Sequence, residues 1–305
     1  MANLKQLKIK RQSVDKTRKV TKAMEAVSAV KMRKSQENAL SSRAFATVAL
    51  RILDAVSKDV EQINHPLVSS QESAKKGLLL VSSDKGLAGS LNSAVLKKAQ
   101  EFLNANKDVV AIAIGRRALE FLKARGVEVL YFRENNKDNV SLQDTLSISS
   151  ELMKAHAGGT VNWSVAYMNF VSTFEQKPVL RKVLPLLEAE LEHLVEDIAP
   201  KKGKFSEFAV KEKDVKSKKA YLIEADSKDI LNELIPELLN VFVHHVLLES
   251  KASEHSARMV AMKAATDKAG EMSHELLLKF NKARQAAITR EVSEITSGVE
   301  AMKES

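Results

Sequence analysis

No glycine or proline occurs before Pro66, and these are the two residues that most often interrupt a helix. Residues 1–58 are instead rich in Ala, Lys, Met, Gln and Arg, which favour helix formation. A single helix of that length spans about 85 Å, because each residue adds about 1.5 Å. We therefore predict that the chain begins with a helix longer than a small domain is wide.

The C-terminal part of the chain has the same character. After the segment EADSKDILNEL, in which Asp226 or Ser227 is the expected N-cap, the only helix breakers are Pro236, Gly270 and Gly298. Pro236 is expected to kink or restart the helix. Because long isolated helices are marginal in water and depend on packing, we expect the N- and C-terminal helices to pack on each other as an antiparallel coiled coil.

An alternating spacing of three and four residues supports this pairing, since it is the repeat of a coiled-coil seam. The C-terminal seam positions are Leu248, Ala252, His255, Met259, Met262, Thr266, Ala269, Ser273, Leu276, Phe280, Ala283 and Ala287. Most are small or flexible, which lets two helices approach closely. The N-terminal seam is poorer, because Thr21 and Ser28 dilute it. The positions that fit are Leu7, Val14, Thr17 and Met24.

The middle of the chain alternates short apolar runs with helical stretches. Residues 77–84, 109–115 and 127–132 are predicted strands. The stretches between them are predicted helices, the first with Ser90 as N-cap and the second closed by Gly126. This alternation predicts a parallel sheet with right-handed crossovers.

Two more strands are expected further along the chain, after the three named above. Residues 162–174 alternate in polarity, and residues 177–186 contain prolines, which suit an edge strand. The predicted fold class is α/β, with a central Rossmann-like parallel-sheet domain plus a long antiparallel coiled coil of the terminal helices. The expected parts are a helix at 1–60, the α/β domain at 74–200, a basic connecting segment at 201–225 and a helix at 226–305.

Positive charge gathers at the N-terminal end. Residues 1–58 hold fourteen Lys or Arg against four Asp or Glu, whereas the whole chain has a net charge of +9. Such a confined basic region predicts an acidic partner surface, although a solvated helix face explains it as well. Phe45 is its only aromatic residue, so bases have nothing to stack on and we expect no nucleic-acid partner.

The composition excludes several other classes. Cysteine is absent, so no disulfide, thiolate catalysis or cysteine metal site is possible. No apolar run reaches the roughly 18–20 residues that span a bilayer. The N-terminus, MANLKQLKIKRQ, is basic but lacks the apolar core of a signal peptide. We expect a soluble protein.

Few residues suggest catalysis. The segment SSDKGLAGSLN (residues 82–92) follows a strand and opens a helix, where α/β folds often bind phosphate, but it lacks the spacing of a phosphate-binding loop. A tight turn with a helix cap is the favoured interpretation. His244 and His245 point in different directions on a helix, and His255 and His274 are too far from them to share a metal, so we expect no metal site.

The ends of the chain resemble a known family. TRKVTKAMEAVSAVKMRKSQ near the N-terminus, and ARMVAMKAATDKAGEM and NKARQAAITREVSEITSG near the C-terminus, are similar to the gamma subunit of F-type ATP synthases. SSDKGLAGSLN resembles the strand-turn-helix motif of this family, with Ala88 and Ser90 where Cys and Gly are common. The resemblance covers essentially the whole chain and is weakest at residues 135–159 and 201–219.

The resemblance implies a rotating shaft. Its coiled coil would turn inside a ring of three alpha and three beta subunits, and its α/β domain would lie with the epsilon subunit on the membrane-embedded c-ring. This couples proton flow to ATP synthesis or hydrolysis on the beta subunits. The chain itself is then no enzyme and has no cofactor and no direct small-molecule substrate. The absence of cysteine and of a transit peptide favours a peripheral protein on the cytoplasmic side of a bacterial inner membrane, and a mature mitochondrial chain is the alternative that the sequence leaves open.

The resemblance also implies roles for individual residues. Contacts with the beta subunits that transmit torque are expected at Lys22, Met24, Arg258, Arg284, Gln285 and Thr289. An apolar bearing is expected at Ile288, Val292, Ile295 and Val299. The foot near the c-ring and epsilon is expected at Tyr221, Leu222 and Glu224.

Two interpretations from other classes stay open on the sequence. One is a basic coiled-coil adaptor with an α/β head. The other is an α/β enzyme whose helices serve only to oligomerise it, and that enzyme would bind a ligand at the DKGLAG turn.

Overall fold

The computed structural model describes residues 2–57, 65–68, 75–135, 137, 139–157, 161–186 and 227–303. The chain divides into two compact units. One comprises Ser28–Arg258, and the other comprises Met1–Val27 with Met259–Ser305. Helices α1 (Ala2–Ser57) and α7 (Ser227–Lys303) contribute to both units, which confirms the two long helices predicted at the ends of the chain.

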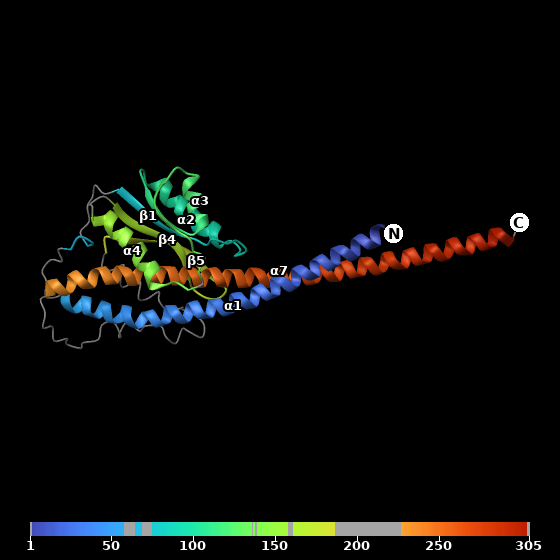
Figure 1. Ribbon diagram of the computed structural model, residues 1–305, viewed down its shortest axis with the longest axis horizontal. Coiled ribbons are helices and arrows are strands. Elements are labelled where there is room, and N and C mark those ends of the chain that lie inside the picture. The colour runs from blue at the N-terminus through green and yellow to red at the C-terminus, as the bar shows by residue number, and fades with distance from the viewer. Residues whose placement is uncertain are drawn as a thin grey trace. The chain divides into compact units, whose positions relative to one another are not determined.

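The unit Ser28–Arg258 is built on a five-stranded sheet (Figure 1). Its strands are β1 (Lys75–Val81), β2 (Val110–Ile114), β3 (Glu128–Arg133), β4 (Val161–Phe170) and β5 (Gln176–Leu184). The order is β3-β2-β1-β4-β5, and the first four strands are parallel. β5 pairs antiparallel with β4 at the edge of the sheet, as its prolines predicted. The central parallel sheet is therefore confirmed.

Alternate side chains of the strands feed two apolar layers, because successive residues of a strand point to opposite faces. On one face, Leu78, Leu80, Ala111 and Ala113 pack with α2 (Leu91–Ala105) and α3 (Arg116–Lys123). On the other face, Leu79, Val81, Ile112 and Trp163 pack with α4 (Leu142–Ala157) and with the first part of α7. Figure 1 shows α2 and α3 on the side of the sheet away from α7.

The start of α7 is part of this domain core. Leu231, Ile235, Leu239, Phe242 and Val246 are buried against the sheet together with α4. Their spacing of three and four residues places them on the side of α7 that packs on the sheet. Helix α7 continues through Pro236, so of the two predicted effects the restart is wrong and the kink stays a prediction. Proline removes only one backbone hydrogen bond, and the apolar packing on both sides of Pro236 holds the helix together.

Helix α4 was not anticipated from the sequence. It covers most of the region 135–159 in which the family resemblance was weakest. Its buried residues Ile148 and Leu152 are one turn apart and face the sheet, whereas Thr145 and Ser149 are buried polar positions that blur the apolar stripe.

The other unit is an antiparallel pair of helices, which confirms the predicted coiled coil. Thr266 Oγ1 donates a hydrogen bond to Thr21 Oγ1 at 2.7 Å, and Ser273 Oγ donates one to Asp15 Oδ1 at 2.6 Å. Residue numbers fall along α1 as they rise along α7, so the helices run in opposite directions. This register places Leu4 across from the turn that contains Arg284.

The buried residues of α7 agree with its predicted seam, whereas those of α1 show that part of its predicted seam is wrong. Met262, Thr266, Ala269, Ser273 and Leu276 are all buried as predicted. On α1, however, Thr17 is exposed, which contradicts its place in the predicted seam.

The residues that seemed to dilute the α1 seam are its most buried members. Thr21 is 8% exposed and Ser28 is 2% exposed, and both continue the seven-residue repeat of Leu7 and Val14. Thr17 lies off this repeat. The hydroxyl of Thr21 is tolerated in the seam because Thr266 hydrogen-bonds to it across the pair.

Gly77 in β1 provides a test of the sheet packing. A Cβ atom at this position would lie 2.5 Å from Val161 Cγ1 and 2.6 Å from the Trp163 ring. We expect Gly77→Ala to lower the free energy of unfolding by about 2 kcal/mol, because overpacking forces a rigid core to shift. Urea denaturation followed by circular dichroism measures the change.

Gly86→Ala is the matched control, since a Cβ atom there would meet no heavy atom within 4 Å. We expect a change within about 0.5 kcal/mol for it. Equal stability of the two variants would contradict the packing of Trp163 against Gly77.

Candidate functional site

The carboxyl edge of the parallel sheet is where an open α/β fold normally binds its ligand. The crevice forms at the switch point, where the chain connections leave in opposite directions. In this sheet β2 and β3 lie on one side of β1 and β4 lies on the other, so the switch point lies between β1 and β4. Residues 82–92, the SSDKGLAGSLN segment, begin at the end of β1 and therefore lie at this point.

The SSDKGLAGSLN segment forms a turn that satisfies its own polar groups. Ser83 Oγ donates to the Lys85 carbonyl oxygen at 2.7 Å, and Asn92 Nδ2 donates to Ser83 Oγ at 2.8 Å. The backbone N–H of Ser83 donates to Asn92 Oδ1 at 3.2 Å. The predicted tight turn is thus confirmed. Ser90 occupies the N-cap position of α2, but its side chain makes no capping hydrogen bond.

The N-terminus of α3, a second place where an anion could bind, is also occupied by protein oxygens. Arg116 N donates to Asp84 Oδ1 at 2.7 Å, and Ala118 N donates to Ser82 Oγ at 2.8 Å. Gly115 makes this close approach possible with its positive φ of 91°, since a Cβ atom there would lie 2.4 Å from the Ser82 carbonyl oxygen. A phosphate group would have to compete with the Asp84 carboxylate for these donors.

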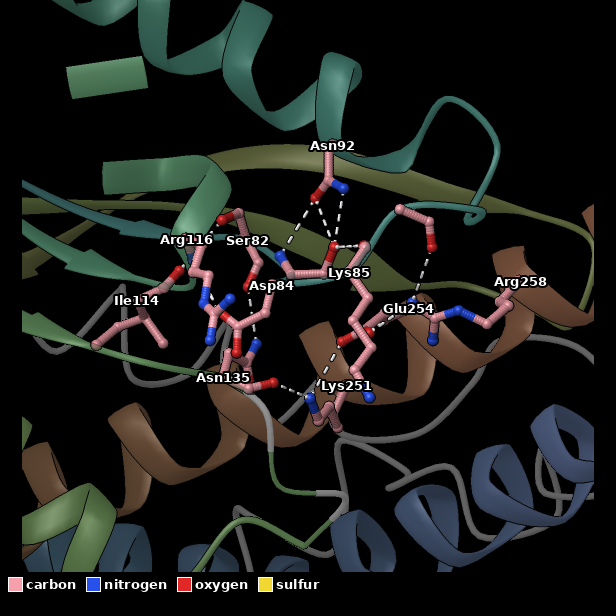
Figure 2. A network of polar contacts seen from close by, with 12 residues as sticks. Ser82, Asp84, Lys85, Asn92, Ile114, Arg116, Asn135, Lys251, Glu254 and Arg258 are labelled. Atoms are coloured by element: carbon pink, nitrogen blue, oxygen red, sulfur yellow. Dashed lines mark hydrogen bonds and ion pairs between the residues drawn. The ribbon is translucent and has the colours of Figure 1, made fainter. Parts of the chain in front are cut away.

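Helix α7 lies at the carboxyl edge of the sheet (Figure 2). Ser253 Oγ donates to the Met168 carbonyl oxygen in β4 at 3.2 Å. Arg258 Nη2 donates to the Gly86 carbonyl oxygen in the turn after β1 at 3.3 Å. Lys251 Nζ donates to the carbonyl oxygen of Asn135, after β3, at 2.6 Å. The helix thus contacts both sides of the switch point.

Asn135 extends the same network to β1. Its Nδ2 donates to the Ser82 carbonyl oxygen at 2.8 Å, while its own carbonyl oxygen accepts from Lys251. Figure 2 shows Asn135 lying between Ser82 and Lys251. The ends of β1 and β3 are therefore linked to α7 through one residue.

Three charged side chains at the centre of this contact form a chain of ion pairs, in which one carboxylate lies between two cations. Glu254 lies 3.1 Å from Lys251 Nζ and 2.8 Å from Arg258 Nη2. All three residues are buried, with exposed fractions of 2% for Lys251, 5% for Glu254 and 8% for Arg258. Burial alone would raise the pKa of Glu254, but Lys251 and Arg258 together outweigh it and lower that pKa. The carboxylate is therefore ionised in the folded protein.

A second buried polar group lies one turn earlier on α7. Asn169 Nδ2 donates to Glu249 Oε2 at 3.0 Å, and His245 Nε2 lies 3.2 Å from Glu249 Oε1. Burial, and then the charge of Glu249, raise the pKa of Tyr167 in β4. His244 faces α4 instead, where its Nδ1 lies 2.9 Å from Thr145 Oγ1, and burial followed by the neighbouring His245 lowers the pKa of His244.

The described part of the chain offers neither a metal site nor a membrane-spanning helix. No three His, Asp or Glu side chains there are arranged to hold a metal ion. In the same residues, no helix combines the length and apolar character required to cross a bilayer.

The residues expected to contact beta subunits differ in their surroundings. Lys22, Arg284, Gln285 and Thr289 are exposed, and Met24 is half-buried. Arg258 is buried and already engaged by Glu254 and Gly86. A role for these residues in torque transmission stays a prediction.

The residues expected to form the bearing lie on one stripe of α7. Ile288, Val292, Ile295 and Val299 are spaced by four, three and four residues and are 49–67% exposed. They follow the turn that faces Leu4, the first residue of α1 whose burial the structure describes. The foot residues Tyr221, Leu222 and Glu224 lie outside the described residues, as do residues 187–197 and 201–219.

The polar contact of α7 with the sheet edge was missed in the sequence. Lys251, Glu254 and Arg258 are spaced by three and four residues, which places them on one side of a helix and allows an ion-pair chain. That spacing was a usable signal. The acceptor oxygens of Asn135, Met168 and Gly86, however, belong to the backbone. A pattern of side chains in the sequence therefore cannot predict them.

The fold and its occupied carboxyl edge define a class of protein. An α/β domain holds a long helix where an enzyme of this fold would hold a ligand, and the same helix continues into an antiparallel coiled coil. The class is therefore that of α/β proteins whose terminal helices form an antiparallel coiled coil.

The comparisons with known proteins identify the family. A family model described as ATP synthase matches residues 3–302. The ATP synthase gamma chain of Pasteurella multocida is 36% identical over 307 residues, which cover 99% of this chain and 100% of that protein. The gamma chain of Heliobacterium modesticaldum is 32% identical over 304 residues, with the same coverage. The chain therefore belongs to the ATP synthase gamma chain family.

Solved structures agree on the fold. A chain in the cryo-EM structure of Euglena gracilis mitochondrial ATP synthase, OSCP/F1/c-ring in rotational state 3, aligns with a TM-score of 0.66 and 17% identity. The alignment covers 99% of this chain and 95% of that chain. A chain of the Tetrahymena thermophila mitochondrial ATP synthase central stalk and c-ring aligns with a TM-score of 0.55 and 21% identity over 81% of this chain and 99% of that chain.

The buried charges of α7 provide a stability test. We expect Glu254→Gln to lower the free energy of unfolding at pH 7 by roughly 3 kcal/mol, because Lys251 and Arg258 would be left buried without a counter-charge. Since the pKa of Glu254 is lowered in the folded state, the stabilisation by its ionised form is complete above its unfolded pKa of about 4.5. It is lost as the pH falls through the folded pKa. Urea denaturation from pH 7 to pH 3 follows this loss.

The control is Glu101→Gln, which removes a carboxylate from an exposed ion pair with Lys98 on α2. We expect a change of less than about 1 kcal/mol for it. A Glu254→Gln variant as stable as this control at pH 7 would show that the buried ion pairs do not stabilise the domain.

Proposed function

We propose that the chain is the central shaft of a rotary F-type ATP synthase. Its coiled coil turns inside a ring of alpha and beta subunits, and its α/β domain, together with an epsilon subunit, rests on a membrane-embedded c-ring. Rotation couples proton flow through the c-ring to ATP synthesis or hydrolysis on the beta subunits. The chain transmits the rotation and performs no chemistry itself.

One observation carries this proposal: the similarity to ATP synthase gamma chains extends over 99% of this chain and 100% of each relative. Both the helical ends and the α/β domain fall within that match. The geometry of the site agrees with a role without catalysis, because α7 occupies the edge of the sheet where an enzyme of this fold would bind a substrate.

The far end of α7 is suited to a bearing. Ile288, Val292, Ile295 and Val299 expose an apolar stripe, and apolar contact excludes water without requiring a fixed direction. Such a surface can slide past successive partners. The neighbouring Gln285 and Thr289 provide exposed polar groups for contacts that depend on the angle of rotation.

The basic part of α1 suits transient contacts. Lys22 and its neighbours Lys16 and Lys19 are exposed, and an exposed ion pair contributes only about 0–1 kcal/mol. Many such weak pairs with acidic beta-subunit loops can form and break during a turn, whereas a single buried pair would hold the shaft at one angle.

The site of action is a membrane surface. We infer that the chain is a peripheral subunit on the cytoplasmic side of a bacterial inner membrane. Support comes from the bacterial sources of its curated relatives, such as Pasteurella multocida and Legionella pneumophila.

Co-purification tests the function directly. We expect the tagged chain, coexpressed with the alpha, beta and epsilon subunits of its source, to recover all three in fixed stoichiometry with ATPase activity. Ile295→Asp should weaken recovery of the alpha and beta subunits by about tenfold, because an unpaired carboxylate would enter an apolar contact. Subunit yields from quantified gels measure both effects.

Glu294→Gln, at the neighbouring exposed position, is the matched control and should leave recovery unchanged. If the unaltered chain recovers no alpha or beta subunits, the proposed function is wrong. If Ile295→Asp recovers them as well as the control does, only the bearing is wrong.

A further inference from the structure

We propose that four side chains within residues 251–258 of α7 fix the angle of the helix about its own axis relative to the α/β domain. Through these side chains, torque passes between the helix and the domain. The inference rests on the proposed function, since a fixed angle of this kind matters only in a shaft under load. It assigns a positioning role to Lys251, Ser253 and Ser256, three residues that are buried within the α/β unit.

Four side chains in this segment bond to four different loops or strands of the domain. Lys251 reaches Asn135 after β3, and Arg258 reaches Gly86 after β1. Ser253 reaches the Met168 carbonyl oxygen in β4, and Ser256 Oγ donates to the carbonyl oxygen of Thr173 in the β4–β5 turn at 2.5 Å. These four donors are defined here as the key. All of their acceptors are backbone oxygens, so the acceptors cannot follow the helix by changing rotamer.

The key holds the helix from two opposite sides. Successive residues of an α-helix are rotated by about 100°, since one turn contains about 3.6 residues. Lys251 and Arg258 therefore project on one side of α7, toward the loops after β1 and β3. Ser253 and Ser256 project on the opposite side, toward β4 and its turn. Rotation of the helix in either direction would break bonds on both sides together.

Burial makes that rotation costly. Ser253 and Ser256 are 0% exposed, and Lys251 is 2% exposed. A displaced donor in this segment would lose its partner without gaining water, which costs more than the bond itself contributes. The apolar part of α7, around Leu239 and Phe242, lacks this directional property, because apolar contact depends on area more than on angle.

The test uses a variant that removes three of the four donors and leaves no buried charge unpaired. In K251M/S253A/S256A, Glu254 keeps Arg258 as its ion-pair partner. The matched control, K154M/S147A/S93A, makes the same chemical changes at side chains that bond within their own helices. Each is assembled into the complete ATP synthase in membrane vesicles. ATP hydrolysis and ATP-driven proton pumping are then measured in the same preparation.

We expect the key variant to pump less per ATP hydrolysed, by about twofold or more, because its helix can slip under load once the directional bonds are gone. The control should match the unaltered complex. A key variant with the same ratio of pumping to hydrolysis as the control overturns the inference but leaves the proposed function standing. Failure of the unaltered chain to assemble and hydrolyse ATP overturns the proposed function instead.

A disulfide provides a second readout that a merely structural role would not change. The chain has no cysteine, so K251M/S253A with T173C/S256C places a single pair at a contact on the key. We expect oxidation to restore the ratio of pumping to hydrolysis and reduction to abolish it again. An oxidised pair that leaves the ratio low contradicts the key.

Discussion

Four charged residues within ten positions of one helix must be buried, and each requires a partner at a fixed place. Glu249, Lys251, Glu254 and Arg258 meet this demand with one another, with Asn169 and with backbone oxygens at the carboxyl edge of the sheet. A charge buried without such partners would cost several kcal/mol. This segment therefore admits one setting of α7 on the sheet, and the placement of the sheet, its loops and the helix all depend on it.

The same constraint explains how α7 comes to cover the carboxyl edge of the α/β domain. The switch point between β1 and β4 offers backbone oxygens and helix N-termini that an enzyme would use for a phosphate or a substrate. Here Asp84 and Ser82 occupy the donors of α3, and α7 occupies the acceptors. The carboxyl edge of the sheet, where this fold commonly binds a ligand, here holds helix α7.

Much of this could be predicted from the sequence, because it depends on local patterns. The absence of Gly and Pro before Pro66, the apolar runs at 77–84 and 109–115, and the repeat through Met262 and Thr266 are each visible without a structure. The errors have a common physical cause. Thr21 and Ser28 were discounted as polar, yet they occupy the seam, because Thr266 supplies a partner for Thr21 and small side chains fit close helices. Helix α4 was missed since Thr145 and Ser149 interrupt its apolar stripe.

The site was harder to predict than the fold, for a reason that concerns helix α7 as a whole. Its spacing of three and four residues serves three surfaces in succession: the sheet core at Leu239, the key at Lys251 and the coiled-coil seam at Thr266. A helical pattern identifies which side of a helix is buried but not what covers it. The groups that cover each side of α7 depend on how distant parts of the chain align with it. For the key, these groups are backbone oxygens far away in the sequence.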